Sequence, residues 1–67
     1  MNEMLKAQLV EKALYWNDCE ITHEGKDYVI LNEVHVEEDY KEDYNVERWE
    51  EFHHEELDIV YTIGKIK

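Results

Sequence analysis

The chain has 67 residues, with 18 Asp or Glu against 7 Lys or Arg, which gives a formal net charge of -11. A chain this short removes only about 60% of its unfolded surface from water, so we expect one thin-cored domain spanning residues 1–67. The charge argues against direct nucleic-acid binding, because that binding needs lysines and arginines to displace counterions, and the basic residues here are dispersed along the sequence.

Composition also bears on whether the chain folds and on its cellular compartment. Hydrophobic residues make up 43% of the chain, enough for a folded core, and dimerisation would add further buried surface. Cys19 is the only cysteine, which excludes an intramolecular disulfide and favours a reducing, cytoplasmic compartment. Met1 to Lys6 show no basic region followed by an apolar run, and no 18 apolar residues stand together, so we expect neither secretion nor a membrane span.

The first predicted element is a helix from Glu3 to Trp16, which Asn2 can cap. Its apolar residues recur at three- and four-residue spacing, as in a helix that faces a core. These residues are Leu5, Leu9, Ala13 and Trp16. We therefore expect Trp16 to be buried and the helix to end at Asn17, which tolerates turn conformations.

Two strands are predicted next, at residues 20–23 and 26–36. Both are rich in β-branched and aromatic residues, and they flank a turn at Glu24 and Gly25. This arrangement predicts a β-hairpin.

A second, shorter helix is predicted before the end of the chain. Asn45 could cap it, and Val46, Trp49 and either Phe52 or His53 would then point inward. In this interpretation Trp49 belongs to the core.

A closing strand is predicted from Leu57 to Ile63, where apolar residues alternate along the chain, and Gly64 would end or bend it. We place this strand beside the hairpin. The predicted fold is therefore α+β, with element order α-β-β-α-β. A three-stranded, mainly antiparallel sheet packs against the N-terminal helix, and the second short helix precedes the last strand.

The acidity is localised along the chain. The segment 1–16 is neutral, 17–36 carries a net charge of -4, and 37–58 carries -9. Carboxylates on alternate residues of a strand lie roughly 6.6 Å apart, a spacing comparable to that of phosphates along one nucleic-acid strand. We expect the anions of 37–58 to share one continuous face, which would attract a basic groove.

The predicted partner-binding residues all lie in this acidic segment. The carboxylates that would replace phosphates are Glu37, Glu38, Asp39, Glu42, Asp43, Glu47, Glu50, Glu51, Glu55 and Glu56. Tyr40 and Tyr44 would act as anchors, because a four-residue spacing puts them on one side of a helix.

These observations favour a small acidic nucleic-acid mimic. It would bind a positively charged protein and occlude the basic groove of a nuclease, repair enzyme or CRISPR effector. Its acidity is typical of small phage and mobile-element proteins, an analogy of composition only. The alternative is a protein–protein interaction or regulatory module that is recognised through a sheet edge or the first helix, with acids that serve solubility.

Other site chemistry has weaker support. Cys19 and His23 could join His35, His53 or His54 around zinc, but the close spacing of zinc-binding cysteines is missing. The acidic run also lacks the glycine-centred spacing of a calcium loop. We therefore predict no metal, no cofactor and no catalytic residue, and an ion-binding or pH-responsive module stays a third hypothesis.

Overall fold

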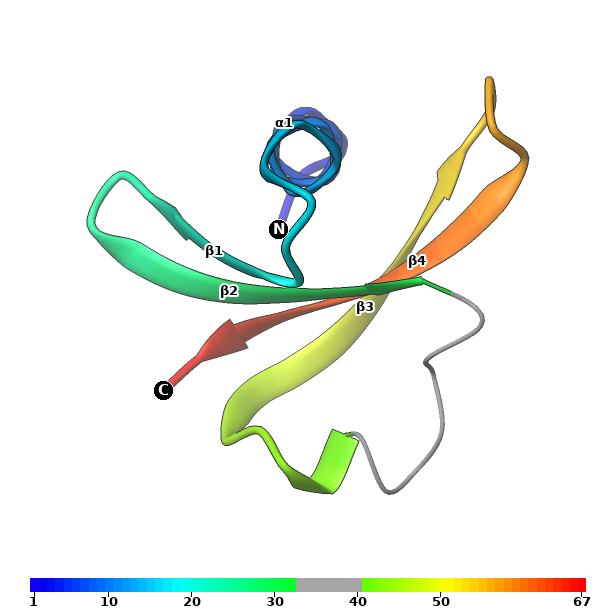
Figure 1. Cartoon of the computed structure of the whole chain (residues 1–67). Helices are drawn as coiled ribbons and strands as arrows, with labels where there is room; N and C mark the ends of the chain where they lie inside the picture. Colours follow the sequence, from blue (N-terminus) through cyan, green and yellow to red (C-terminus); the bar gives the residue numbers. More distant parts are fainter. Residues whose placement is uncertain (33–40) are drawn as a thin grey trace.

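The computed structural model describes residues 1–32 and 41–67, which form an N-terminal helix, one antiparallel sheet and a short helical segment at 41–42 (Figure 1). The elements are α1 (Glu3–Trp16), β1 (Glu20–His23), β2 (Lys26–Asn32), β3 (Val46–His54) and β4 (Ile59–Ile66). The strands lie in the order β1-β2-β4-β3. The α+β class with an N-terminal helix is confirmed, but the sheet has four strands where three were predicted.

The helix begins and ends at the predicted residues. The Asn2 side chain accepts a hydrogen bond from the Leu5 N–H at 2.8 Å and so caps the first turn. Asn17 takes the left-handed conformation with φ 51°, and its N–H donates to the Ala13 carbonyl. Both ends are therefore encoded by local polar residues.

The predicted hairpin is also confirmed. β1 and β2 pair antiparallel around Glu24 and Gly25, whose φ angles of 52° and 77° are those that a tight two-residue turn requires. The described part of β2 ends at Asn32. Residues 33–36 of the predicted strand lie outside the described residues.

The predicted second helix is wrong, because this segment forms β3. Val46 lies opposite Ile66 and Trp49 lies opposite Gly64, so a β-bulge places residues three apart on the same face of the sheet. Spacing of three is also the spacing of a helix face, which explains the incorrect prediction.

The closing strand lies beside the hairpin as predicted, since β4 pairs with β2 on one side and with β3 on the other. It starts later than predicted, because Leu57 and Asp58 belong to the turn before it. It also continues through Gly64 to Ile66. A Cβ atom at Gly64 would lie 3.0 Å from the Trp49 ring, so glycine permits the close packing of this ring on β4.

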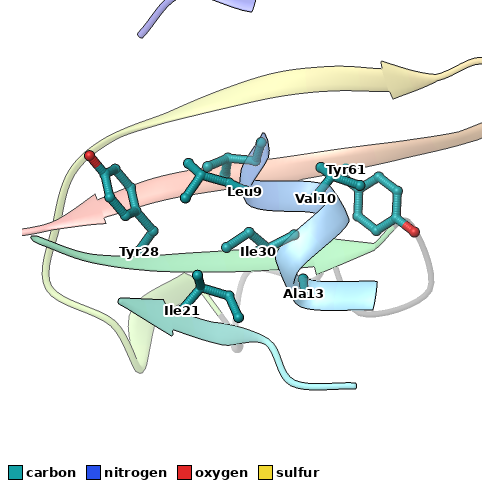
Figure 2. Packing of buried hydrophobic residues seen from close by; sticks show 8 residues of the cluster. Leu9, Val10, Ala13, Ile21, Tyr28, Ile30 and Tyr61 are labelled. Carbon is teal, nitrogen blue, oxygen red and sulfur yellow. The ribbon is translucent and has the colours of Figure 1, made fainter. Parts of the chain in front are cut away.

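The core lies between α1 and one face of the sheet (Figure 2). It contains Leu9, Val10, Ala13, Ile21, Tyr28, Ile30, Tyr61 and Ile63. On the opposite face Val29 and Leu31 are also buried, and Trp49 is half-buried there rather than under the helix.

Burial of Trp16 was predicted and is wrong, since this residue is 67% exposed. It has the helical phase of Leu9, two turns earlier. However, it is the last residue of α1 and lines a surface hollow next to β1.

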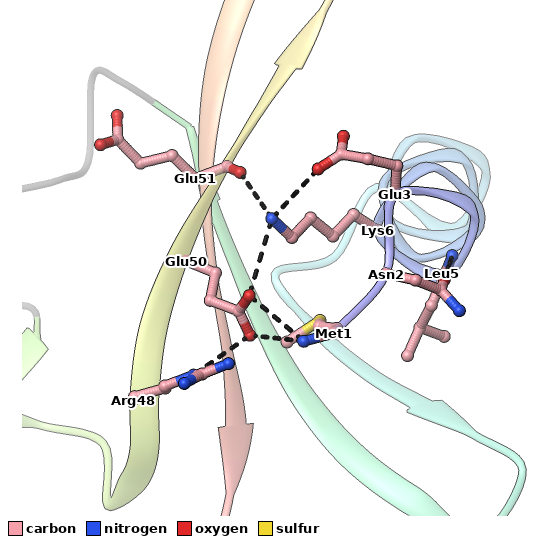
Figure 3. Close-up of polar contacts among 8 residues, drawn as sticks. All are labelled: Met1, Asn2, Glu3, Leu5, Lys6, Arg48, Glu50 and Glu51. Atoms are coloured by element: carbon pink, nitrogen blue, oxygen red, sulfur yellow. Dashed lines mark hydrogen bonds and ion pairs between the residues drawn. The ribbon is translucent and has the colours of Figure 1, made fainter.

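Two lysines of α1 form hydrogen bonds with the two edge strands of the sheet. Lys6 Nζ donates to the Glu51 carbonyl of β3 at 3.1 Å, as Figure 3 shows. Lys12 Nζ donates to the Thr22 carbonyl of β1 at 3.3 Å. Each lysine therefore satisfies a backbone acceptor on a strand that has a neighbour on one side only, a common protection against edge pairing.

Candidate partner-binding surface

The strand conformation of β3 separates the carboxylates that were predicted to share one face. Glu50 lies opposite Ile63 and faces α1, whereas Glu51 lies opposite Thr62 and faces away from it. Glu37, Glu38, Asp39 and Tyr40 lie outside the described residues. For the β3 acids, the prediction of one continuous anionic face is therefore wrong.

The Glu50 carboxylate lies at the centre of a cluster of ion pairs (Figure 3). Its carboxylate accepts hydrogen bonds from the Met1 ammonium at 2.9 and 3.2 Å, and it lies 3.6 Å from both Lys6 Nζ and Arg48 Nε. The bonds from the Met1 ammonium lower the pKa of Glu50, although burial opposes them. With its side chain only 18% exposed, Glu50 contacts its own chain and has little surface left for a partner.

Glu47 is also paired, since its Oε1 lies 3.2 Å from Lys65 Nζ. The two residues border a hollow of about 420 Å³ that Lys26 and Arg48 line as well. The structure thus gathers basic residues that are dispersed in the sequence. There Lys65 pairs with Glu47, and Arg48 shares the Glu50 carboxylate with Lys6 and the Met1 ammonium.

Glu42, Asp43 and Tyr44 precede β3, and Tyr44 lies close to Cys19, the residue before β1. The Tyr44 N–H donates to the Lys41 carbonyl at 3.2 Å, and the Tyr44 hydroxyl lies 3.8 Å from Cys19 Sγ. The hydrogen bond with Cys19, then burial and then the charges of neighbours such as Asp43 raise the pKa of Tyr44 to about 12.

Glu20 is a further anion beside Tyr44 and contributes to the raised pKa of its hydroxyl. Sequence reasoning missed Cys19 and Glu20 as members of this surface. The net charge of -4 over residues 17–36 was the available signal. The contact itself joins residues 25 positions apart and could not be read from local patterns.

Glu55 and Glu56 lie in the exposed turn between β3 and β4, at the other end of β3 from Glu42 and Asp43 (Figure 1). A strand of nine residues separates these two acidic pairs by roughly 30 Å. One partner groove would have to span most of the molecule to contact both.

Histidines next to this turn connect it to the rest of the fold. His54 Nε2 lies 3.0 Å from Glu11 Oε1 of α1, and His54 Nδ1 accepts the Leu57 N–H at 3.2 Å. His53 Nε2 lies 2.9 Å from Asp58 Oδ1. These imidazoles make structural contacts to single carboxylates.

Several carboxylates make no side-chain hydrogen bond or ion pair within residues 1–32 and 41–67. They are Glu20, Glu24, Glu42, Asp43, Glu51, Glu55 and Glu56. The charges of Asp43 and Glu20 both act on the Tyr44 hydroxyl, and we call these three residues the β1–β3 acidic end.

Exposed aromatic side chains form a second candidate surface that the sequence analysis missed. Tyr15 and Trp16 are 79% and 67% exposed, and their rings meet edge to face with centroids 4.9 Å apart. Helical periodicity assigned Trp16 to the core and drew no attention to Tyr15. Large exposed aromatic residues are characteristic of binding surfaces.

The described residues bring no three His, Cys, Asp or Glu side chains into a metal-binding group. Within the same part of the chain, no helix is long and apolar enough to span a membrane. Comparison with protein-family models, curated proteins and solved structures finds no significant match. Function is therefore argued from the residues themselves.

Proposed function

We propose that this protein is a non-enzymatic inhibitor that binds a basic protein surface in place of nucleic acid. The observation that supports this function is the β1–β3 acidic end, where Glu20 and Asp43 lie beside Tyr44 and have no cation paired with them among the described residues. Glu42, next to Asp43, is likewise unpaired there and exposed. The target is the phosphate-binding groove of a nucleic-acid enzyme.

The proposed mechanism is electrostatic occlusion. A net charge of -11 on a body with a radius of gyration of 10.8 Å steers the protein toward cationic surfaces and raises the association rate at low salt. Carboxylates at the acidic end then take the place of phosphates on lysines and arginines of the groove. Tyr44 adds a contact residue with little conformational freedom to lose.

The test is charge reversal at two matched positions. Glu42→Lys with Asp43→Lys changes the β1–β3 acidic end, and Glu55→Lys with Glu56→Lys makes the same change of net charge at the far end of β3. Partners are captured from a lysate of the source cells, eluted with a salt gradient and identified by mass spectrometry. We expect nucleic-acid enzymes that elute at moderate salt, and a much larger loss of capture with the first variant.

Equal capture by the first variant and the unchanged protein, at the same eluting salt, would refute the mimic. Equal losses from both variants would mean that only total charge matters. Neither result would be compatible with a defined phosphate-like surface.

A second candidate function is supported by the exposed Tyr15 and Trp16. Here the protein is an interaction module that is recognised through α1, and its carboxylates serve solubility. The α1 segment is electrically neutral, so this binding would depend little on salt. Capture that Trp16→Ala abolishes and that salt leaves unchanged would favour this alternative.

A further inference from the structure

A hollow of about 240 Å³ lies next to Trp16, where the end of α1 meets β1. Its lining residues are Lys12, Trp16, Asp18, Glu20, Ile21 and Thr22. We propose that this Trp16 hollow receives an arginine side chain of the basic partner. The inference rests on the proposed function, because it assumes that the partner is cationic.

Trp16 provides the apolar surface of the hollow. The Tyr15 ring meets it at an interplanar angle of 87° and supports its orientation. The negative face of an indole ring attracts a cation, and the attraction grows as the cation is desolvated. The exposure of Trp16 leaves room for such a ligand.

Carboxylates provide the charge of the hollow. Asp18 Oδ1 accepts the Glu20 N–H at 3.1 Å, so this hydrogen bond holds the Asp18 side chain in place. The Glu20 carboxylate has no partner among the described residues. Lys12 is the only cation that lines the hollow, and its Nζ donates to the Thr22 carbonyl, so the lining keeps a net charge of -1.

Arginine fits these groups better than lysine does. Its planar guanidinium stacks on aromatic rings and presents several N–H donors to carboxylates at once, whereas the lysine ammonium is a strongly hydrated point charge. A second copy of this chain is the less suitable occupant, because two bodies of charge -11 repel each other. A basic segment of another protein has the complementary charge.

The experiment uses hexa-arginine and hexa-lysine peptides as probes of the full chain at low salt. Indole N–H resonances are followed by ¹H–¹⁵N NMR, and the Trp16 signal is assigned by its loss in Trp16→Ala. We expect the Trp16 resonance to shift and saturate with hexa-arginine, and Trp16→Ala to weaken that peptide about fivefold. Trp16→Phe, which keeps an aromatic face, should restore part of the affinity.

Two paired variants that remove the same charge distinguish binding in the Trp16 hollow from general electrostatic attraction. Asp18→Asn with Glu20→Gln keeps the Asp18 oxygen that accepts the Glu20 N–H, and it should weaken hexa-arginine about tenfold. Glu55→Gln with Glu56→Gln removes the same charge from the β3–β4 turn and should change affinity about twofold or less.

An unshifted Trp16 resonance, an equal loss in both paired variants, or equal effects of Trp16→Ala on the two peptides would overturn the inference. Any of these results could coexist with partner loss on reversal of Glu42 and Asp43, which would leave the proposed function intact. Conversely, the peptide experiment could give the expected result while the Glu42 and Asp43 reversal variant captures partners as well as the unchanged protein does. That outcome would refute the nucleic-acid mimic and support arginine binding in the Trp16 hollow.

Discussion

Lys6 and Lys12, six residues apart on α1, each donate a hydrogen bond to a backbone carbonyl on a different edge strand. The helix thus does more than cover the apolar face of the sheet. It also occupies an acceptor on β1 and another on β3, at positions where a foreign strand could otherwise pair. Binding by strand addition at these positions would have to displace a lysine.

The two lysines should contribute unequally to stability. Lys6 is buried and also lies beside Glu50. Lys6→Met leaves the Glu51 carbonyl without its donor and removes one of the cations around Glu50, so we expect a loss of about 2 kcal/mol. Lys12 makes a more exposed contact, and Lys12→Met should cost about 0.5 kcal/mol. Urea unfolding measures both free energies. Similar losses would show that the Glu50 cluster adds nothing to the carbonyl contact.

Glu50 should make the stability of the protein depend on acid. Its pKa in the folded state lies below the ordinary value of 4.5, so the unfolded chain binds a proton first as the pH falls. The contribution of Glu50 is therefore complete above about pH 5.5 and is lost as the pH falls through 4.5 to the folded-state pKa.

The comparison of the unchanged protein with Glu50→Gln isolates this contribution. We expect Glu50→Gln to be less stable by about 1–2 kcal/mol at pH 7, with a difference that shrinks steadily below pH 4.5. Acid also weakens the repulsion among the many carboxylates, and this affects both proteins alike. The difference in stability between them cancels this general effect. Urea unfolding between pH 3 and 7 supplies the data, and a difference independent of pH would contradict the assignment.

Gly64 should resist substitution because of what lies over it. A Cβ at this position would meet the Trp49 ring and Val46 Cγ1, each at 3.0 Å, so Gly64→Ala forces a neighbour to move. We expect a loss of about 1–3 kcal/mol in thermal or urea unfolding. In a protein that already carries Trp49→Leu, Gly64→Ala should reduce the free energy of unfolding by less than it does in the unchanged protein. An unchanged stability of Gly64→Ala would mean that the bulged part of β3 adapts freely.

The sequence predicts those parts of the fold that depend on local signals. Asn2 and Asn17 define the helix, and the Glu24-Gly25 pair defines the hairpin turn, because each acts on residues within a few positions of itself. β3 was predicted incorrectly because its bulge gives Val46 and Trp49 the three-residue spacing of a helix. Periodicity cannot distinguish these two origins.

The candidate site was predictable only as a region of charge. The alternation of a strand sends Glu50 and Glu51 to opposite faces, and this separation is lost when the segment is taken for a helix. The burial of Glu50 against Met1 depends on a contact 49 residues apart. Exposure of Trp16 depends on where the helix ends relative to the sheet, which its angular phase does not reveal.

The contact between Tyr44 and Cys19 provides a spectroscopic test of the β1–β3 acidic end. The pKa of Tyr44 is raised to about 12, first by its hydrogen bond with Cys19 and then by burial and neighbouring charges such as Glu20. In a titration of tyrosinate absorbance near 295 nm, we expect Tyr44 to ionise well after an exposed tyrosine of ordinary pKa 10.0.

Cys19→Ala should lower the pKa of Tyr44 toward 10.0, and Glu20→Gln should lower it less, in the order of their contributions. Burial also raises the pKa of Tyr61, so the late transition that disappears in Tyr44→Phe is assigned to Tyr44. Because the folded-state pKa is the higher one, the contribution of Tyr44 to stability is complete below pH 10 and declines as the pH rises toward 12. If Cys19→Ala leaves the transition of Tyr44 unchanged, Tyr44 does not contact Cys19, and the acidic end proposed as the partner surface is not assembled.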